Sequence, residues 1–242
     1  RWFRLLCLSL VVMRCQPLRR ALGERRNMVV LFESEKSRQF FDEHFELLTK
    51  ESDIGCVMLG VSAIDEIFNN FFLAILPKDA NSKIQKRIFD SRGVFGELSS
   101  KLDVAYTCRF ISRDLYESVH LLRKLRNKLA HKVVDFDLRD YIDDVHNIFS
   151  KINGDVLGVM MSATDEVLIK HVFQTISDIT DHSDETKRLF SSEEDIREYV
   201  KSRPNLLEIL VEKKVKIAFT YGVLILGALI INCQENALRK FA

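Results

Sequence analysis

The chain contains only three prolines, Pro17, Pro77 and Pro204, so the 126 residues from position 78 to position 203 have none. Glycine is also scarce, with nine among 242 residues. Sandwiches and barrels need frequent tight turns, and Gly and Pro are the residues that usually form them. A composition of 47% hydrophobic and 29% charged residues excludes a disordered or collagen-like chain. The sequence therefore predicts an all-α fold, a compact helical bundle of about six to eight helices.

Charge is unevenly distributed along the chain. Residues 1–27 hold seven Arg and one Glu, a net charge of +6, and because the whole chain sums to +1 the remainder carries −5. A mildly acidic body argues against a broad nucleic-acid-binding surface. The five cysteines form no CxxC pair, which favours a reducing, cytoplasmic compartment over a disulfide framework or a zinc site. We expect no metal and no cofactor.

The N-terminal region combines basic residues with a nine-residue apolar run, Leu5–Met13, which superficially matches a signal peptide. No cleavage site of the small-residue type follows the run. We interpret residues 1–27 as an extension outside the fold, with Met28 as the natural start and residues 28–242 as a single all-helical domain. A membrane-surface anchor and a targeting segment are the alternatives.

A second apolar stretch, Ile217–Ile231, has fifteen residues without a charge. A membrane span needs about 20 apolar residues. The sequence therefore favours a buried terminal helix over a transmembrane helix, and membrane is not an expected partner.

Helical periodicity of apolar residues predicts most of the remaining elements. The strongest signal covers Ile54–Leu76, which Pro77 should end. Ser112 is the expected N-cap of a helix reaching about Lys132. Further helices are expected at Glu35–Lys50, Glu97–Phe110, Asp135–Ser150, Thr164–Asp181, after a capping box formed by Ser191 and Glu194, and from about Asn205 to Cys233. A basic connector around Lys83, Lys86 and Arg87, a loop at Phe89–Gly96, and a loop or short strand at Gly154–Ser162 should separate them.

One arginine falls among apolar residues on the helix that begins after Ser112. At about 100° per residue, Arg126 lies inside the apolar stripe of its helix, where a guanidinium needs a carboxylate, carbonyl groups or a wet cleft. Asp65 and Glu66, on the other strong helix, are the candidate partners. The stripe itself consists of Leu115, Val119, Leu122 and Leu129.

A second face of the same helix gathers His120, Asn127 and His131. In a catalytic interpretation, Arg126 holds a phosphate, Asn127 orients a group and His131 moves a proton, a set that suffices for metal-free RNA cleavage. In a structural interpretation, Arg126 is a buried ion pair and His131 caps the helix end. The spacing alone favours the structural interpretation.

Other chemistry-bearing patterns are weak. The chain has no Gly-rich phosphate loop, no HExxH and no GxSxG motif. Asp143, Asp144 and His146 do not predict a metal site, because adjacent carboxylates point to different sides of a helix. No helix-turn-helix that could read DNA is evident, so direct sequence-specific DNA binding is not expected.

Three runs together resemble the mannitol operon repressor (MltR) family. They are GVFGELSSKLDVAY from Gly93 to Tyr106, FISRDLY from Phe110 to Tyr116, and LLRKLRNKLAH from Leu121 to His131. About 40 residues are closely similar. The resemblance implies a compact all-helical domain and a transcriptional repressor of sugar-alcohol uptake genes that acts through partner proteins.

The motif formed by Arg126, Asn127 and His131 also resembles the HEPN superfamily. That resemblance implies a metal-independent ribonuclease site shared across a homodimer. By position, Arg126 would contact phosphate, Asn127 would be the polar helper and His131 the proton-transfer residue. Many HEPN-like proteins keep the fold without the activity.

Three hypotheses follow. The first is a non-enzymatic regulator of the repressor type, a homodimer that works through another regulatory protein. The second is a HEPN-type endoribonuclease, a toxin or defence effector, whose partner is RNA. The third is a membrane-associated regulator that uses the apolar ends of the chain. The sequence favours the first and therefore leans away from an enzyme.

Overall fold

The structure is a computed structural model that describes residues 32, 34–130, 136–176, 180–181, 184–188, 190 and 192–239. The predicted all-α class is confirmed. Within this described part there are nine α-helices, slightly more than expected, with one 3-10 helix and one two-stranded hairpin. The predicted extension 1–27 and the candidate residue His131 lie outside the described residues.

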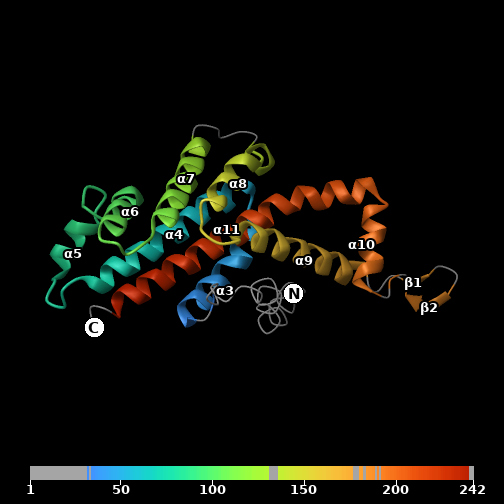
Figure 1. The fold of residues 1–242 in the computed structure, drawn as a ribbon, viewed down its shortest axis with the longest axis horizontal. Helices are drawn as coiled ribbons and strands as arrows, with labels where there is room; N and C mark the ends of the chain where they lie inside the picture. Colours follow the sequence, from blue (N-terminus) through green and yellow to red (C-terminus); the bar gives the residue numbers. More distant parts are fainter. Residues whose placement is uncertain are drawn as a thin grey trace.

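The longest helix, α11 (Pro204–Leu238), is the axis of the molecule. Its 35 residues span about 50 Å at 1.5 Å per residue. Helices α3 (Glu35–Lys50) and α4 (Asp53–Ile75) lie alongside its C-terminal half, and the hydrophobic core forms where the three helices meet (Figure 1).

The ends of α3 and α4 follow from local chemistry. The hydroxyl groups of Ser34 and Ser52 accept hydrogen bonds from the backbone N–H of Ser37 and Gly55, which caps both helix starts. The bounds of α3 are those predicted. Helix α4 ends before Pro77, because the residue before a proline is driven out of the helical conformation.

Two glycines allow other helices to approach α11 closely. A Cβ at Gly222 would lie 2.4 Å from the Phe149 ring, and one at Gly227 would lie 2.3 Å from the Phe40 ring.

The predicted burial of the stretch Ile217–Ile231 is confirmed. By length and composition alone, two helices among the described residues could cross a membrane: α4 and the part of α11 from Lys213 to Leu238. In the most apolar 18 residues of each, 56% and 78% respectively are buried inside the structure.

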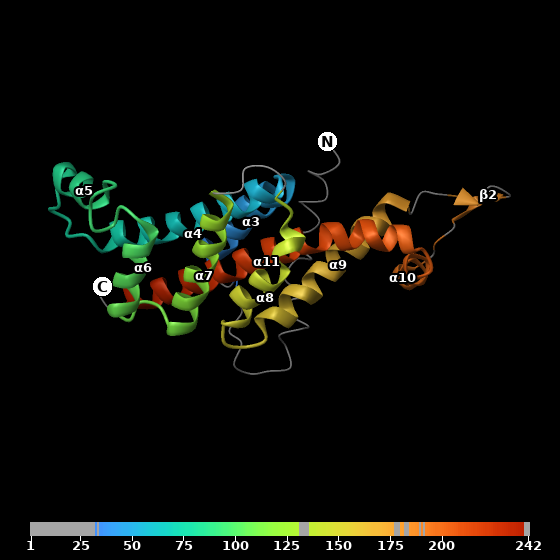
Figure 2. The same ribbon diagram turned by 90° about the horizontal axis from the view of Figure 1, so that it is seen from above.

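A second group of helices packs over α4 and α11 (Figure 2). It consists of α6 (Leu98–Thr107), α7 (Arg113–Ala130), the 3-10 helix η1 (Leu138–Tyr141) and α8 (Ile142–Ser150). The four leucine and valine residues of the predicted α7 stripe are all buried. Two large apolar side chains of this group are exposed, Tyr106 at 39% and Ile142 at 53%.

Two segments expected to be irregular are helical. The basic connector is helix α5 (Ser82–Phe89), whose first turn is capped by the Asn81 side chain. The expected loop or strand at Gly154–Ser162 is the first part of helix α9 (Val156–Ile176). Asp155 accepts from the Gly158 N–H at this helix start, and the buried side chains recur at helical spacing: Val156, Val159, Met160 and Ala163.

The distal part of α9 and the N-terminal part of α11 extend away from the core and are bridged by α10 (Glu193–Lys201). We call this projection the arm (Figure 1). A hairpin of β1 (Thr180–Asp181) and β2 (Asp184–Arg188) lies at its end. The capping box of α10 is one residue later than predicted: Ser192 Oγ accepts from the Asp195 N–H, and the Asp195 carboxylate accepts from the Ser192 N–H.

Candidate functional site

Arg126 and Asn127 lie together in the last turns of α7. Arg126 is half-buried and Asn127 is exposed. The Arg126 guanidinium donates to Asn127 Oδ1 from Nη2 at 3.2 Å and from Nε at 3.4 Å. The pairing of Arg126 with Asp65 or Glu66 that the helix positions suggested is not formed. Because His131 lies outside the described residues, the structure brings together two of the three candidate catalytic residues.

The cation that Asp65 binds is Lys101 of α6. Lys101 Nζ lies 2.6 Å from Asp65 Oδ1, and the Lys101 side chain is 2% exposed. Lys101 was not among the residues expected to matter from the sequence, although its position on the helix could have indicated that it is buried. Lys101 shares helical spacing with Leu98, Leu102 and Ala105, which are all buried.

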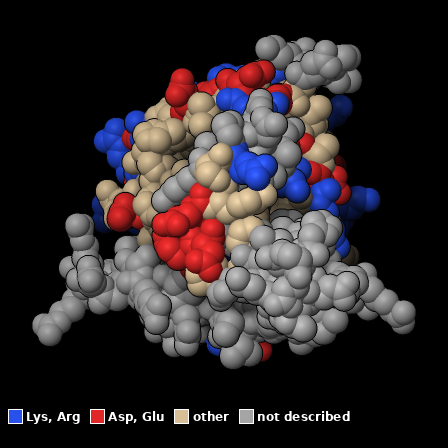
Figure 3. Space-filling view, turned by 90° about the vertical axis from the view of Figure 1, so that its right-hand side faces the viewer, with Lys and Arg blue, Asp and Glu red and all other residues tan. Residues whose placement is uncertain are grey.

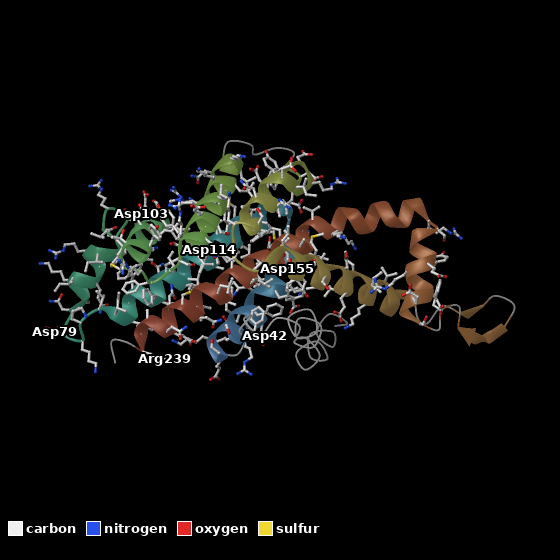
Figure 4. All side chains as sticks on the ribbon, viewed as in Figure 1. Asp42, Asp79, Asp103, Asp114, Asp155 and Arg239 are labelled. Carbon is white, nitrogen blue, oxygen red and sulfur yellow. The ribbon has the colours of Figure 1, made fainter. Side chains whose placement is uncertain are left out.

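His120, on α7, contacts Asp103 of α6 and Tyr116 of its own helix. The Tyr116 hydroxyl donates to Asp103 Oδ1 at 2.8 Å, and His120 Nε2 is 3.6 Å from the same oxygen. The Tyr116 ring stacks on Tyr106 at 4.6 Å and meets the His120 ring edge-on at 4.5 Å. Figure 4 labels Asp103 at this edge of the molecule.

The electrostatics of this cluster favour the neutral forms of His120 and Tyr116. Burial, and then the positive charge of Arg123, lower the pKa of His120, and Asp103 only partly opposes them. The hydrogen bond to Asp103 raises the pKa of Tyr116. At neutral pH the imidazole is therefore uncharged and the phenol keeps its proton, which suits a structural contact between α6 and α7.

The arm carries a compact aromatic cluster. The rings of Phe190 and Tyr199 meet edge-on with centroids 4.9 Å apart, and the Arg203 guanidinium lies 5.2 Å from the centroid of Tyr199. Figure 3 views the molecule from this end and shows acidic side chains gathered on one area of the face. The exposed acids that α10 contributes are Glu194, Asp195 and Glu198.

The described residues contain no group of three or more His, Cys, Asp or Glu side chains that could hold a metal ion. Asp144, one of the weak metal candidates, is occupied by Lys128, whose Nζ lies 2.7 and 2.9 Å from its two carboxylate oxygens. The three described cysteines are free thiols.

A groove of about 330 Å³ lies between α3, α4 and the C-terminal part of α11. Its floor is apolar and its rim carries charged and amide side chains. The sequence does not indicate this groove, because α3 and α4 form it together with α11, which is far from them in the chain.

Comparison with known proteins gives no match: no family model, no curated protein and no solved structure corresponds to this chain. The resemblances to the mannitol operon repressor family and to the HEPN superfamily therefore stay predictions.

Proposed function

We propose that the protein is a cytoplasmic, non-enzymatic regulator of the mannitol operon repressor type, which acts through contacts with another regulatory protein. Two observations support this proposal. The sequence runs between Gly93 and His131 resemble that family, and the arm presents a projecting surface. The observation that carries the proposal is the arm.

The arm has the features of a protein-binding element. It extends from the core as a bridged pair of helices. Its cluster of Phe190, Tyr199 and Arg203 combines the residue types that dominate interface energetics. Arg203 is exposed, and Phe190 and Tyr199 are half-buried, so a partner can reach the cluster.

The test is transcription in the organism that carries the gene. Deleting the gene should raise transcripts of sugar-alcohol uptake genes, and the wild-type gene should restore repression. The double variant Tyr199→Ala with Arg203→Glu should fail to restore it, because removal of central aromatic and Arg contacts costs about 2 kcal/mol or more each in binding.

The matched control is Arg113→Ala, an exposed Arg on α7 whose ion pair with Glu117 is at the surface. This variant should restore repression fully, because exposed ion pairs contribute little. Unchanged transcripts in the deletion strain would contradict the regulatory proposal. Full restoration of repression by the double variant would show that the aromatic cluster of the arm is not needed for regulation.

The proposal includes a homodimer. The mass in solution should be twice the 28.1 kDa of one chain, measured by light scattering after size-exclusion chromatography. A mass of one chain at micromolar concentration would contradict it.

The second candidate function is metal-independent RNA cleavage. The observation that favours it is the contact between Arg126 and Asn127 at the accessible end of α7. Purified protein is incubated with RNA in EDTA beside Arg126→Ala and His131→Ala. Catalysis by these residues requires a loss of about 100-fold or more in each variant. The regulator proposal predicts no cleavage that depends on either residue.

A further inference from the structure

The groove between α3, α4 and α11 has the construction of a small-molecule site. Its floor is formed by buried side chains, among them Phe40, Ile67, Phe71 and Ile231. Figure 4 labels Asp42 on α3 and Arg239 directly after α11. The groove lies between these two helices and α4. A volume of about 330 Å³ lies within the range of ligand pockets with apolar walls and a few polar groups.

A buried amide in the groove lacks a partner. Gln234 is 6% exposed, and its Nε2 forms no hydrogen bond with any described residue. Leaving such a donor unpaired costs about 1–3 kcal/mol. Gln234 lines the groove, but Nε2 itself has almost no exposed surface. An oxygen atom of a bound molecule can accept this hydrogen bond once the Gln234 side chain turns its amide toward the groove. The ligand should therefore carry a hydrogen-bond acceptor.

The charges around the groove are mainly negative. Three carboxylates line it, those of Glu43, Glu66 and Glu235, against one ammonium group, that of Lys36. Glu43 accepts a hydrogen bond from Gln39 Nε2 at 2.7 Å. The carboxylates of Glu66 and Glu235 make no hydrogen bond or ion pair within the described part of the chain. These two unpaired carboxylates favour a cationic ligand.

His44 is a further polar side chain that lines the groove. Its Nδ1 lies 2.9 Å from the Phe40 carbonyl oxygen. A carbonyl only accepts, so Nδ1 is the donor in this contact. The His44 ring packs on Phe40 with centroids 4.5 Å apart, which fixes its orientation beside the floor.

We propose that this groove binds a small organic cation: a primary amine with a compact apolar body and a hydroxyl or carbonyl oxygen. The ammonium group pairs with Glu66 and Glu235, the apolar body packs on the Phe40 and Phe71 rings, and the oxygen accepts from Gln234 Nε2. This site does not depend on the regulatory function proposed above, since it rests on the groove alone.

The experiment is calorimetric titration of the full chain with three probes of similar size. Tyramine carries the amine, the ring and a hydroxyl group. Phenethylamine lacks the hydroxyl, and 4-hydroxyphenylacetate has a carboxylate in place of the amine. We expect saturable binding of tyramine, weaker binding of phenethylamine, and binding of 4-hydroxyphenylacetate at least about tenfold weaker than that of tyramine, because its charge is repelled.

Variants assign the binding to the groove. Glu66→Gln combined with Glu235→Gln should weaken tyramine binding by about tenfold or more, since a charge-assisted contact is lost. Gln234→Leu keeps the side-chain volume and removes the donor, so tyramine should then bind no better than phenethylamine. Glu117→Gln, on α7 and outside the groove, is the matched control and should leave affinity unchanged.

Three results would overturn the proposal. They are no saturable tyramine binding up to about 10 mM, equal binding of tyramine and 4-hydroxyphenylacetate, and unchanged tyramine affinity in the double Glu variant. Because Glu66 is exposed and Glu235 is half-buried, the double variant should fold, which is checked by circular dichroism. Binding is measured directly, so its failure is distinct from a failure of the transcription test.

Discussion

Lys101 Nζ lies 2.6 Å from Asp65 Oδ1, and this pair joins α6 to α4. The two partners differ in their contact with water: the Lys101 side chain is 2% exposed and that of Asp65 is 32% exposed. The buried charge therefore belongs to the lysine, and the carboxylate is the group that compensates it.

This asymmetry predicts different costs for removing the two partners. Asp65→Ala should reduce the free energy of unfolding by about 3–5 kcal/mol, because it leaves a buried, unpaired ammonium group. Lys101→Met, which fills a similar volume without charge, should change it by about 1 kcal/mol or less. Urea unfolding of both variants provides the measurement. Equal losses in the free energy of unfolding would contradict the prediction that the buried ammonium group of Lys101 is the partner that depends on the pair.

The close approach of neighbouring helices to α11 predicts a penalty for enlarging its glycines. Gly222→Ala and Gly227→Ala should each lower stability by about 1–3 kcal/mol through overpacking against Phe149 and Phe40. Gly60→Ala is the matched control, since its Cβ would lie 3.4 Å from Val223, an ordinary contact. That variant should be neutral or stabilised by its higher helix propensity. The melting temperatures of the three variants test this prediction. A stabilised Gly227→Ala variant would contradict the close packing of Gly227 against Phe40.

Thiol reactivity should differ sharply between two described cysteines. Burial raises the pKa of Cys56 to about 11, so only about one thiol in a thousand is ionised at pH 8 and able to react. Cys108 is exposed. Iodoacetamide at pH 8 should therefore modify Cys108 and spare Cys56, as read by peptide mass mapping. Both should react in guanidinium chloride, and rapid labelling of Cys56 in the native protein would contradict its burial.

The lowered pKa of His120 predicts a pH-dependent stability. Because the folded state disfavours the protonated imidazole, the unfolded chain binds more protons below its ordinary pKa of about 6.5. The contribution of His120 is therefore complete above that value and is lost as the pH falls through the lower folded value. The charges around it are Asp103 from α6 and Arg123 and Lys124 from α7.

The measurement is urea unfolding between pH 5 and pH 8. Wild-type stability should rise with pH across the lower part of this range, and His120→Gln should show a smaller rise. A profile as steep in the variant as in the wild type would assign the dependence to other groups.

Periodicity and capping predicted most of the long helices, but not α5 or the start of α9. The bounds of α3, the end of α4 before Pro77 and the buried face of α7 were all predictable, because they depend on interactions within one helix or on a single apolar face. The loop or short strand expected at Gly154–Ser162 was wrong: from Val156 onward the segment is helical. Asp155 and the packing of Val156 and Val159 make that segment helical.

The sequence by itself determined the helical class and the apolar face of each main helix, since both follow from the spacing of residues along the chain. Only the tertiary structure decided which polar groups meet. Asp65 binds Lys101 and not Arg126, and Gln234 lies beside a groove shared by three helices. Such pairings depend on how distant helices are placed against one another, and that placement is set by packing, as at Gly227 and Phe40.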